Sequence, residues 1–344
     1  MITVSVVGGG GWGTALAASI GGQGVPVRLW VRRSEHAEQI QIERENKAHL
    51  PGVFLPPAVS VTDQLEDVAS FSNYIILVVP SQAVRSVVGR LAPYLTPEHR
   101  LLNAAKGLEI GTHLRMSQVI AESVPCIDPK RIASISGPNH AEEVGRGIPS
   151  ATVVAAPDES VAAEWQDILM TESLRVYTTD DLIGVELGGA LKNVIALAAG
   201  ISDGLGFGDN TRAALVTRGL AEMVRLGTAL GARPLTFSGL AGIGDLMATC
   251  NSRHSRNRSA GEAIGRGIPL ESIVENTVNV IEGIPTCKAV LGLAQRFGVD
   301  MPISESVYGI LYRREDPRLT VSALMSRGPK SEWEPIPIIP RQSP

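Results

Sequence analysis

Short apolar runs recur along the first half of the chain, separated by helical or turn segments. They lie at residues 2–7, 25–31, 74–79, 101–105, 132–136, 150–155 and 173–177. Runs of this length that are rich in Val, Ile and Leu are typical of strands buried on both faces of a parallel sheet. The pattern therefore predicts a mainly parallel α/β sheet that continues to about residue 178.

Beyond residue 178 the apolar positions change to helical spacing. Leu, Ile, Val and Ala recur every three or four residues over 180–201, 210–230, 256–264 and 281–297. We therefore predict an all-α second domain at 179–328. Residues 329–344 are rich in proline and are predicted to form a mobile tail, to which we assign no function.

A glycine-rich turn follows the first apolar run and opens a helix. Gly8, Gly10 and Gly13 have the spacing of the dinucleotide-binding fingerprint. There the first glycine allows a tight turn, the second lets the backbone approach a pyrophosphate, and the third lets the helix pack on its strand. The N–H groups of the helix N-terminus attract the phosphates. We therefore predict a Rossmann-like dinucleotide-binding domain at 1–178.

The second apolar run ends in Arg32 and Arg33, with Glu35 as the first carboxylate after it. A ribose 2′-hydroxyl usually meets an acidic residue at this point, whereas a 2′-phosphate is accommodated by arginine. We therefore predict NADP(H) as the preferred cofactor, with NAD(H) as the alternative. Arg32 is the leading contact and Arg33 the second. The alternative interpretation is that both arginines are simply solvated at the strand end.

Composition is typical of an ordinary enzyme. The 344 residues, 44% of them hydrophobic, are enough for two cores. The net charge of −4 gives no general attraction to nucleic acid or to anionic membranes. Cys126, Cys250 and Cys287 are far apart and odd in number, which argues against a disulfide framework or a cysteine metal site.

We expect a cytoplasmic protein. The cysteine usage fits a reducing compartment. The N-terminus enters a strand directly, without the features of a signal peptide, and uninterrupted apolar runs such as 75–79 are too short to span a bilayer. We expect neither a membrane span nor a nucleic-acid partner.

Polar and glycine residues follow several of the predicted strands. Pro80 and Ser81 follow one, Lys106 another, and Gly137 and Asn139 a third. Because ligands of open α/β sheets bind beyond the carboxyl ends of the strands, all five are candidate site residues by position alone.

The helix at 182–200 is apolar around nearly its whole circumference, and Lys192 is its only cation. Burial lowers the pKa of a lysine toward the range that is useful for proton transfer, so Lys192 is a candidate catalytic residue. The alternative is that Lys192 reaches the surface or neutralises Glu186. The glycines at 188 and 189 permit close approach of another helix or of a ligand.

Two further clusters follow in the helical half. Asp245 lies in the glycine-rich segment 239–247, where its ordinary role would be to cap a helix. Ser255, Arg256 and Asn257 lie in a segment that interleaves three arginines with hydroxyl and amide donors. Such a mixture suits a phosphate monoester, the alternative being a basic solvated loop.

The chain resembles the bacterial NAD(P)-dependent glycerol-3-phosphate dehydrogenases over nearly its full length. The matching blocks lie at 8–16, 49–51, 79–81, 105–109, 136–138, 191–196, 239–245, 255–257 and 280–283. The resemblance implies a small-molecule substrate and the reversible reduction of dihydroxyacetone phosphate to sn-glycerol 3-phosphate, which feeds phospholipid synthesis. A homodimer formed through the helical domain is compatible with this sequence.

The resemblance also implies roles for single residues. The proton donor and acceptor falls on Lys192. The implied substrate contacts are Lys106, Gly137, Asn139, Asp245, Ser255, Arg256 and Asn257. The implied cofactor contacts are Gly11, Trp12, Arg32, Lys106, Ala141, Arg256, Val280 and Glu282. Spacing alone does not point to Ala141, Val280 or Glu282.

Three positions depart from the family pattern. Trp12 and His49 replace other flat side chains, whereas Asn139 stands where a small hydroxyl residue is common and changes the donor geometry. Two other readings stay open. One is a β-hydroxyacid or 6-phosphogluconate-type dehydrogenase of the same plan, against which the 255–257 block and Lys106 argue. The other is a non-catalytic sensor of the NADP redox state, for which a buried lysine would have no use.

Overall fold

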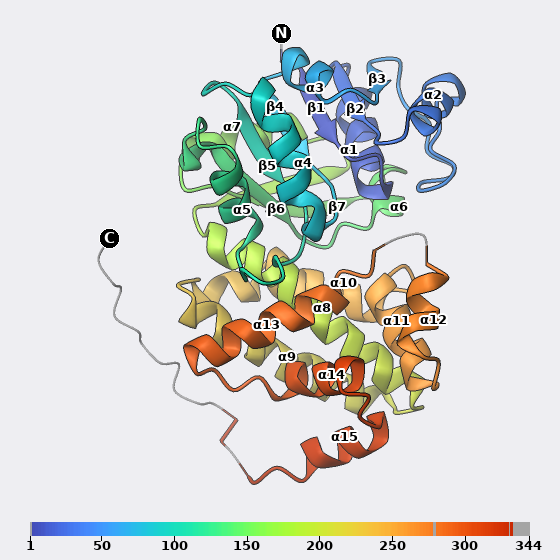
Figure 1. The fold of residues 1–344 in the computed structure, drawn as a ribbon, viewed down its shortest axis with the longest axis vertical. Coiled ribbons are helices and arrows are strands. Elements are labelled where there is room, and N and C mark those ends of the chain that lie inside the picture. The colour runs from blue at the N-terminus through green and yellow to red at the C-terminus, as the bar shows by residue number, and fades with distance from the viewer. Residues whose placement is uncertain (1, 278–279, 330, 333–344) are drawn as a thin grey trace. The chain divides into compact units, whose positions relative to one another are not determined.

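A computed structural model describes residues 2–277, 280–329 and 331–332 (Figure 1). The chain forms two compact units: unit 1 comprises Met1–Lys106 and Arg115–Val185, and unit 2 comprises Gly107–Leu114 and Glu186–Pro344. The main boundary between the units, between Val185 and Glu186, therefore lies a few residues beyond the predicted boundary near residue 178. The predicted tail at 329–344 lies almost wholly outside the described residues.

Unit 1 is built on one eight-stranded sheet with the order β3-β2-β1-β4-β5-β6-β7-β8. The strands are β1 (Val4–Val7), β2 (Val27–Trp30), β3 (Val59–Thr62), β4 (Tyr74–Leu77), β5 (Arg100–Asn103), β6 (Ile132–Ser136), β7 (Ser150–Ala155) and β8 (Leu174–Thr179). Neighbouring strands are parallel except β6 and β7. The predicted mainly parallel α/β sheet is confirmed.

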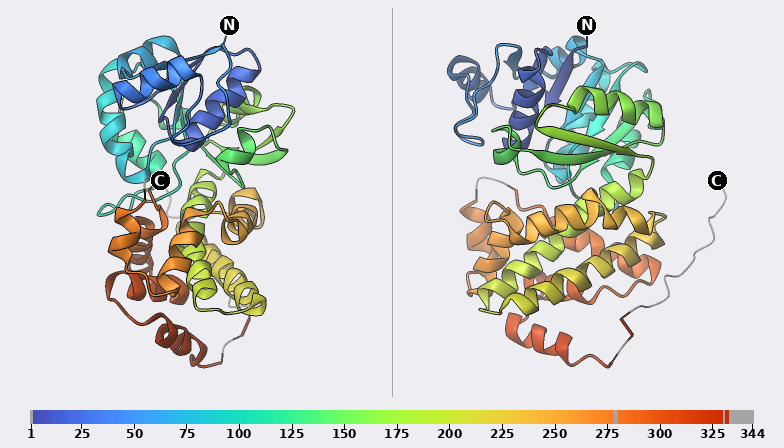
Figure 2. Two further views of the ribbon diagram at one scale, coloured as in Figure 1. Left: turned by 90° about the vertical axis from the view of Figure 1, so that its right-hand side faces the viewer. Right: turned by 180° about the vertical axis from the view of Figure 1, so that it is seen from behind.

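Helices cover both faces of this sheet (Figure 2). They are α1 (Gly11–Gly22), α2 (Ser34–Glu43), α3 (Leu65–Phe71), α4 (Val84–Leu91), α5 (Met116–Ser123), α6 (Ala141–Val144) and α7 (Glu159–Leu169). Side chains alternate along β1: Val4 and Val6 enter the core with α1, while Ser5 Oγ donates to Val68 O of α3 at 2.8 Å. The first strand is thus buried on both faces.

Unit 2 is helical, as predicted. Its helices are α8 (Leu182–Gly204), which begins in unit 1, α9 (Asp209–Ala229), α10 (Asp245–Asn251), α11 (Arg256–Gly265), α12 (Leu270–Glu275), α13 (Gly283–Phe297), α14 (Pro302–Tyr312) and α15 (Pro317–Met325). Helix α8 is long and apolar enough to cross a bilayer, contrary to the expectation from uninterrupted runs. Because 94% of its most apolar window is buried inside the molecule, it has the character of a core helix.

Glycines bring α11 against α8 at backbone distance. A Cβ added to Gly200 would lie 2.0 Å from Arg258 O, and one added to Gly261 would lie 2.1 Å from Leu197 O. Gly188, which the sequence marked as a site of close approach, packs against Ala241 O in the same way. These contacts fix the N-terminus of α11 beside the middle of α8.

The segment Gly107–Leu114 leaves β5 and joins the helical unit. Leu108 is fully buried, and His113, which has a left-handed backbone conformation (φ +62°), lays its ring over Gly292 of α13. An added Cβ at Gly292 would lie 2.3 Å from that ring. Unit 2 is therefore completed by a segment from the middle of the α/β half of the sequence.

A buried carboxylate joins α9 to the start of α14. Glu222 accepts hydrogen bonds from Ile303 N (2.6 Å), Ser304 N (3.1 Å) and Ser304 Oγ (2.9 Å). Burial raises the pKa of Glu222 from 4.5 to about 7, against the opposing effect of these hydrogen bonds. The folded state therefore favours the protonated form of this side chain.

This shift gives unit 2 a testable pH dependence. Because the folded pKa is raised, the contribution of Glu222 to stability is fully present below pH 4.5 and is lost as the pH rises through about 7. As the pH rises from 4.5 to about 7, we expect the free energy of unfolding of Glu222→Gln to increase by about 3 kcal/mol relative to that of wild type. Urea denaturation at a series of pH values measures it, with exposed Glu305→Gln as the control. Equal pH slopes for wild type and Glu222→Gln would contradict the assignment.

Candidate active site

The glycine-rich turn has the geometry that its sequence predicts. Gly8 has φ +132°, and an added Cβ there would lie 2.3 Å from Val78 O. An added Cβ at Gly13 would lie 1.9 Å from Gly8 O, so the helix packs directly on the turn. An added Cβ at Gly10, by contrast, would meet nothing within 4 Å. Protein packing thus accounts for Gly8 and Gly13, and the open side of Gly10 leaves room for a ligand.

Two helices start side by side at this turn. An added Cβ at Gly11, the first residue of α1, would lie 3.5 Å from Cβ of Ala141, the first residue of α6, and 2.9 Å from His49 O. Trp12 follows in α1 and packs against the core of unit 1. Ala141, which only the family resemblance indicated, therefore adjoins the predicted phosphate-binding turn.

Arg32 and Arg33 are exposed between β2 and α2. Ser34, the first residue of α2, donates from its hydroxyl to the carboxylate of Asp63, which follows the neighbouring strand β3. Hydrogen bonds from Ser34 and then Gln64 lower the pKa of Asp63. An acidic group therefore does lie near this strand end, although it comes from the adjacent strand and not from β2.

Lys106 and Gly137 meet at the ends of β5 and β6, where Lys106 Nζ donates to Gly137 O at 2.9 Å. Gly137 has φ +146°, which favours glycine. Asn139 Nδ2 donates to Ala151 O at 3.1 Å, while its Oδ1 is buried and accepts no hydrogen bond from the described residues. This orphaned acceptor suits a ligand hydroxyl or amide. Of the other strand-end candidates, Ser81 is buried and Pro80 is exposed.

Lys192 forms the centre of the candidate site in unit 2. Its Nζ donates to Asp245 Oδ1 at 2.6 Å and to Thr249 Oγ1 at 2.6 Å, and the Lys192 and Asp245 side chains are only 8% and 3% exposed. Thr249 donates its own proton to Asp245 O at 2.7 Å, so its lone pairs face Lys192. Lys192 is therefore buried and paired with Asp245, and the N-cap residue of α10 is Gly244, not Asp245.

The phosphate-binding candidates surround the N-terminus of α11. Ser255 is the N-cap residue, and its Oγ accepts from Arg258 N at 3.2 Å. Arg256 Nη1 donates to Val280 O at 3.0 Å. Asn257 Nδ2 donates to Asn193 Oδ1 at 2.9 Å, and its Oδ1 accepts from the N–H of Gly283, the residue after Glu282, also at 2.9 Å. The structure thus groups all five predicted residues of this region, 255–257, Val280 and Glu282.

Arg258, the third arginine of that segment, points into an ion-pair network. Its Nε lies 3.0 Å from Asp203 Oδ2 on α8, and Arg212 of α9 binds the same carboxylate. The Asp203 side chain is only 7% exposed. Arg258 therefore anchors α11 to α8 and α9, which leaves Arg256 as the better candidate for binding a phosphate.

The buried cysteines show no sign of nucleophilic chemistry. Burial raises the pKa of the Cys250 and Cys287 thiols to about 12. Both therefore stay protonated near neutral pH, and the thiolate is the nucleophilic form. Cys126 is exposed, and all three are free thiols.

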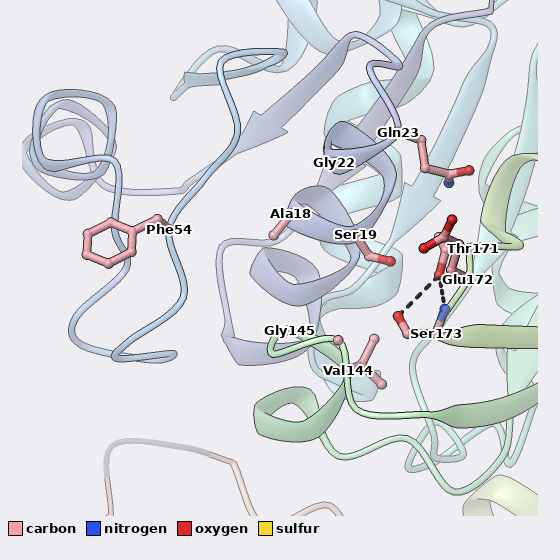
Figure 3. Close-up of a pocket in the computed structure, with 11 residues that line it drawn as sticks. Ala18, Ser19, Gly22, Gln23, Phe54, Val144, Gly145, Thr171, Glu172 and Ser173 are labelled. Carbon is pink, nitrogen blue, oxygen red and sulfur yellow. Dashed lines mark hydrogen bonds between the residues drawn. The ribbon is translucent and has the colours of Figure 1, made fainter.

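A surface cavity of about 550 Å³ lies along the C-terminal half of α1 (Figure 3). Ser19, Gln23 and Glu172 line it, and none of the predicted site residues does. The Glu172 carboxylate and the negative end of the α1 dipole make this cavity unsuitable for binding phosphates. The cavity is distinct from the glycine-rich turn at the other end of α1.

Comparison with known proteins identifies the family. Residues 3–162 match the model of the NAD-dependent glycerol-3-phosphate dehydrogenase N-terminus, and residues 181–322 match that of the C-terminus. The chain belongs to the NAD-dependent glycerol-3-phosphate dehydrogenase family. The resemblance seen in the sequence is thereby confirmed.

Members of this family match the chain almost end to end. A glycerol-3-phosphate dehydrogenase [NAD(P)+] of Desulfitobacterium hafniense is 49% identical over 98% of this chain and 95% of its own length. One of Carboxydothermus hydrogenoformans is 50% identical over 96% and 98%. The crystal structure of glycerol-3-phosphate dehydrogenase from Coxiella burnetii has a TM-score of 0.90 at 37% identity, covering 95% of this chain and 99% of its own.

Sequence reasoning missed several residues that surround the predicted ones. Thr249 carries a weak signal, since it lies four residues after Asp245 and hence on the same helix face. Asp203 and Asp63 carry none, because their partners come from other elements of the fold. Such contacts depend on packing between elements and not on local spacing.

Proposed function

We propose that this protein is an NAD(P)-dependent oxidoreductase that reduces dihydroxyacetone phosphate to sn-glycerol 3-phosphate and catalyses the reverse reaction, as the names of its relatives indicate. The observation that carries the proposal is the buried Lys192, held by Asp245 and Thr249. A hydride acceptor needs a proton donor at its carbonyl oxygen, and a fixed ammonium can act in that role. If the ion pair served only to stabilise the fold, apolar residues of similar volume could replace both side chains without loss of activity.

In the proposed reaction, Lys192 donates a hydrogen bond to the ketone oxygen and then transfers a proton to it as negative charge develops. Asp245 and Thr249 keep Nζ in one position, so little reorganisation is needed when the charge forms. In the reverse direction the Lys192 amine accepts the hydroxyl proton. Lys106, Gly137 and Asn139 are the proposed substrate contacts of unit 1, of which Asn139 Oδ1 offers an acceptor to a hydroxyl.

The residues at the glycine-rich turn fit a dinucleotide. The open side of Gly10 and the N-terminus of α1 would accommodate its pyrophosphate, and Gly8, Gly11, Trp12, Gly13 and Ala141 would lie around it. When bound, the dihydronicotinamide supplies the hydride. Exposed Arg32 and Arg33 would pair with a 2′-phosphate, which favours NADPH, while the Asp63 carboxylate beside Ser34 is compatible with a 2′-hydroxyl and hence with NADH.

The substrate phosphate would bind at the N-terminus of α11. Arg256 supplies a charged fork, and Ser255 and the second N–H of the Asn257 amide add neutral donors. The family resemblance also implies that Arg256, Val280 and Glu282 contact the cofactor. The hydrogen bond from Arg256 to Val280 O, two residues before Glu282, brings these residues together.

Arg256→Ala is expected to raise the KM for dihydroxyacetone phosphate by about ten- to a hundredfold with a smaller effect on kcat, because a charge-assisted phosphate contact is lost. Initial rates at saturating NADPH measure this. Arg253→Ala, in the same basic segment, is the matched control. An unchanged KM in Arg256→Ala would move the phosphate site elsewhere.

The function itself is tested by following NADPH absorbance after mixing the protein with dihydroxyacetone phosphate, with dihydroxyacetone as the control lacking phosphate. Rapid oxidation that requires the phosphate supports the proposal, and the ratio of NADPH to NADH rates tests the role of Arg32. NADPH binding without turnover would favour the redox-sensor interpretation. A cytoplasmic location and a homodimer are further proposals from the sequence, and light scattering in solution tests the second.

A further inference from the structure

A buried asparagine is hydrogen-bonded to the glycine-rich turn and to the helix that follows it. Asn46, in the connection between α2 and β3, is 0% exposed. Its Nδ2 donates to Gly9 O at 2.9 Å and to Thr14 Oγ1 at 2.8 Å. Gly9 lies within the turn and Thr14 in the first turns of α1, so one amide group ties both sides of the turn together.

The orientation of this amide is fixed by the Gly9 carbonyl, which can only accept, and a third contact satisfies the amide oxygen. Asn46 Oδ1 lies 3.2 Å from Nε2 of His36, a half-buried residue of α2. The oxygen can only accept, so His36 must donate through Nε2. If the amide were reversed, Oδ1 would face the carbonyl of Gly9 and two acceptors would oppose each other. The Gly9 carbonyl therefore selects the orientation in which Nδ2 points at the turn, and His36 satisfies the Asn46 oxygen in that orientation.

Holding the carbonyl of Gly9 also sets the direction of the next N–H. The Gly9–Gly10 peptide is trans and planar, so its C=O and N–H point in opposite directions. With Gly9 O directed toward Asn46, the N–H of Gly10 points away from Asn46. Gly10 is the glycine whose added Cβ would meet nothing within 4 Å. A pyrophosphate that occupies this open space next to Gly10 could therefore accept from an N–H that is directed away from Asn46.

The backbone of Asn46 contributes to the same arrangement. Its carbonyl accepts from His49 N at 3.2 Å and Leu50 N at 2.8 Å. This turn brings His49 O next to Gly11, the first residue of α1. Asn46 thus positions two separate stretches of chain around the helix N-terminus.

We infer that Asn46 is a positioning residue for dinucleotide binding: it orients the Gly10 N–H toward the cofactor pyrophosphate, and His36 supports it as the hydrogen-bond partner of its amide oxygen. This inference rests on the proposed function, since it assigns the turn to NAD(P). It gives a role to residues that neither the sequence motifs nor the family resemblance indicated.

The test uses full-length protein with Asn46→Ala, His36→Ala and His36→Gln, and exposed Asn276→Ala as the control. NADPH fluorescence titration gives Kd, and initial rates give kcat and both KM values. We expect Asn46→Ala to raise the Kd and KM for NADPH about tenfold and His36→Ala about threefold, on the scale of one hydrogen bond. The kcat and the KM for dihydroxyacetone phosphate stay within about twofold of wild type. His36→Gln, which keeps an N–H donor, restores most of the affinity.

Two results would overturn the inference. One is an unchanged NADPH Kd in both Asn46→Ala and His36→Ala. The other is a parallel loss in kcat and in both KM values, which would indicate general damage to the fold. His36→Ala keeps the test informative if Asn46→Ala does not fold, because His36 is partly exposed. Failure of wild-type protein to bind NADPH would instead remove the proposed function.

Discussion

Replacement of Lys192 with alanine is expected to lower kcat for the reduction of dihydroxyacetone phosphate by about two to four orders of magnitude. The variant loses the proposed proton donor, whereas the glycine-rich turn of unit 1 is unchanged. NADPH affinity should therefore stay close to that of wild type. Steady-state rates together with fluorescence titration of NADPH measure the two effects separately.

Lys192→Ala also leaves Asp245 buried without its cation, so a loss of activity could reflect a loss of structure. Lys192→Met keeps the length of the side chain, and the melting temperatures of both variants identify any unfolded fraction. Turnover near the wild-type level in a folded variant would refute the assignment of Lys192 as the proton donor.

The second large effect is expected from Asp245→Ala, which should lower the free energy of unfolding by about 3–5 kcal/mol. The Lys192 ammonium would then be buried without the carboxylate that pairs with it in the wild type. Urea denaturation monitored by circular dichroism measures the loss. Wild-type stability in this variant would contradict the burial and pairing of the two side chains.

A double variant separates stability from catalysis. Lys192→Met combined with Asp245→Leu removes both charges and keeps similar volumes, so it should recover most of the lost stability. It should nevertheless show no turnover, because no proton donor is restored. Recovery of activity in this variant would mean that the reaction does not depend on the ion pair.

Local sequence rules predicted much of unit 1. Gly8, Gly10 and Gly13 were assigned separate roles, and the structure gives each a different environment that fits its role. Strands β6 and β7 were predicted with their observed bounds, since each is a short, largely apolar segment bounded by turn residues. Strand β3 was missed because Val59–Thr62 alternates with polar residues at the edge of the sheet.

Long-range pairing in the site was not predictable. Lys192 and Asp245 were both selected as functional residues, but nothing in their spacing of 53 positions indicates that their side chains meet. The same applies to Asn46, which looks like an ordinary loop asparagine until its contact with Gly9 O is seen. These contacts exist because separate elements pack together, and that information is not contained in any local window of sequence.

The segment Gly107–Leu114 also limits how this protein can be dissected and how it is assembled. Because that segment belongs to the helical unit, the fragment 186–344 lacks Leu108 and the ring of His113 that covers Gly292. Neither unit is therefore a contiguous piece that can be excised by a single cut. During synthesis, residues 107–114 emerge long before α13, so they acquire their packing partner only when the ribosome has nearly finished the chain.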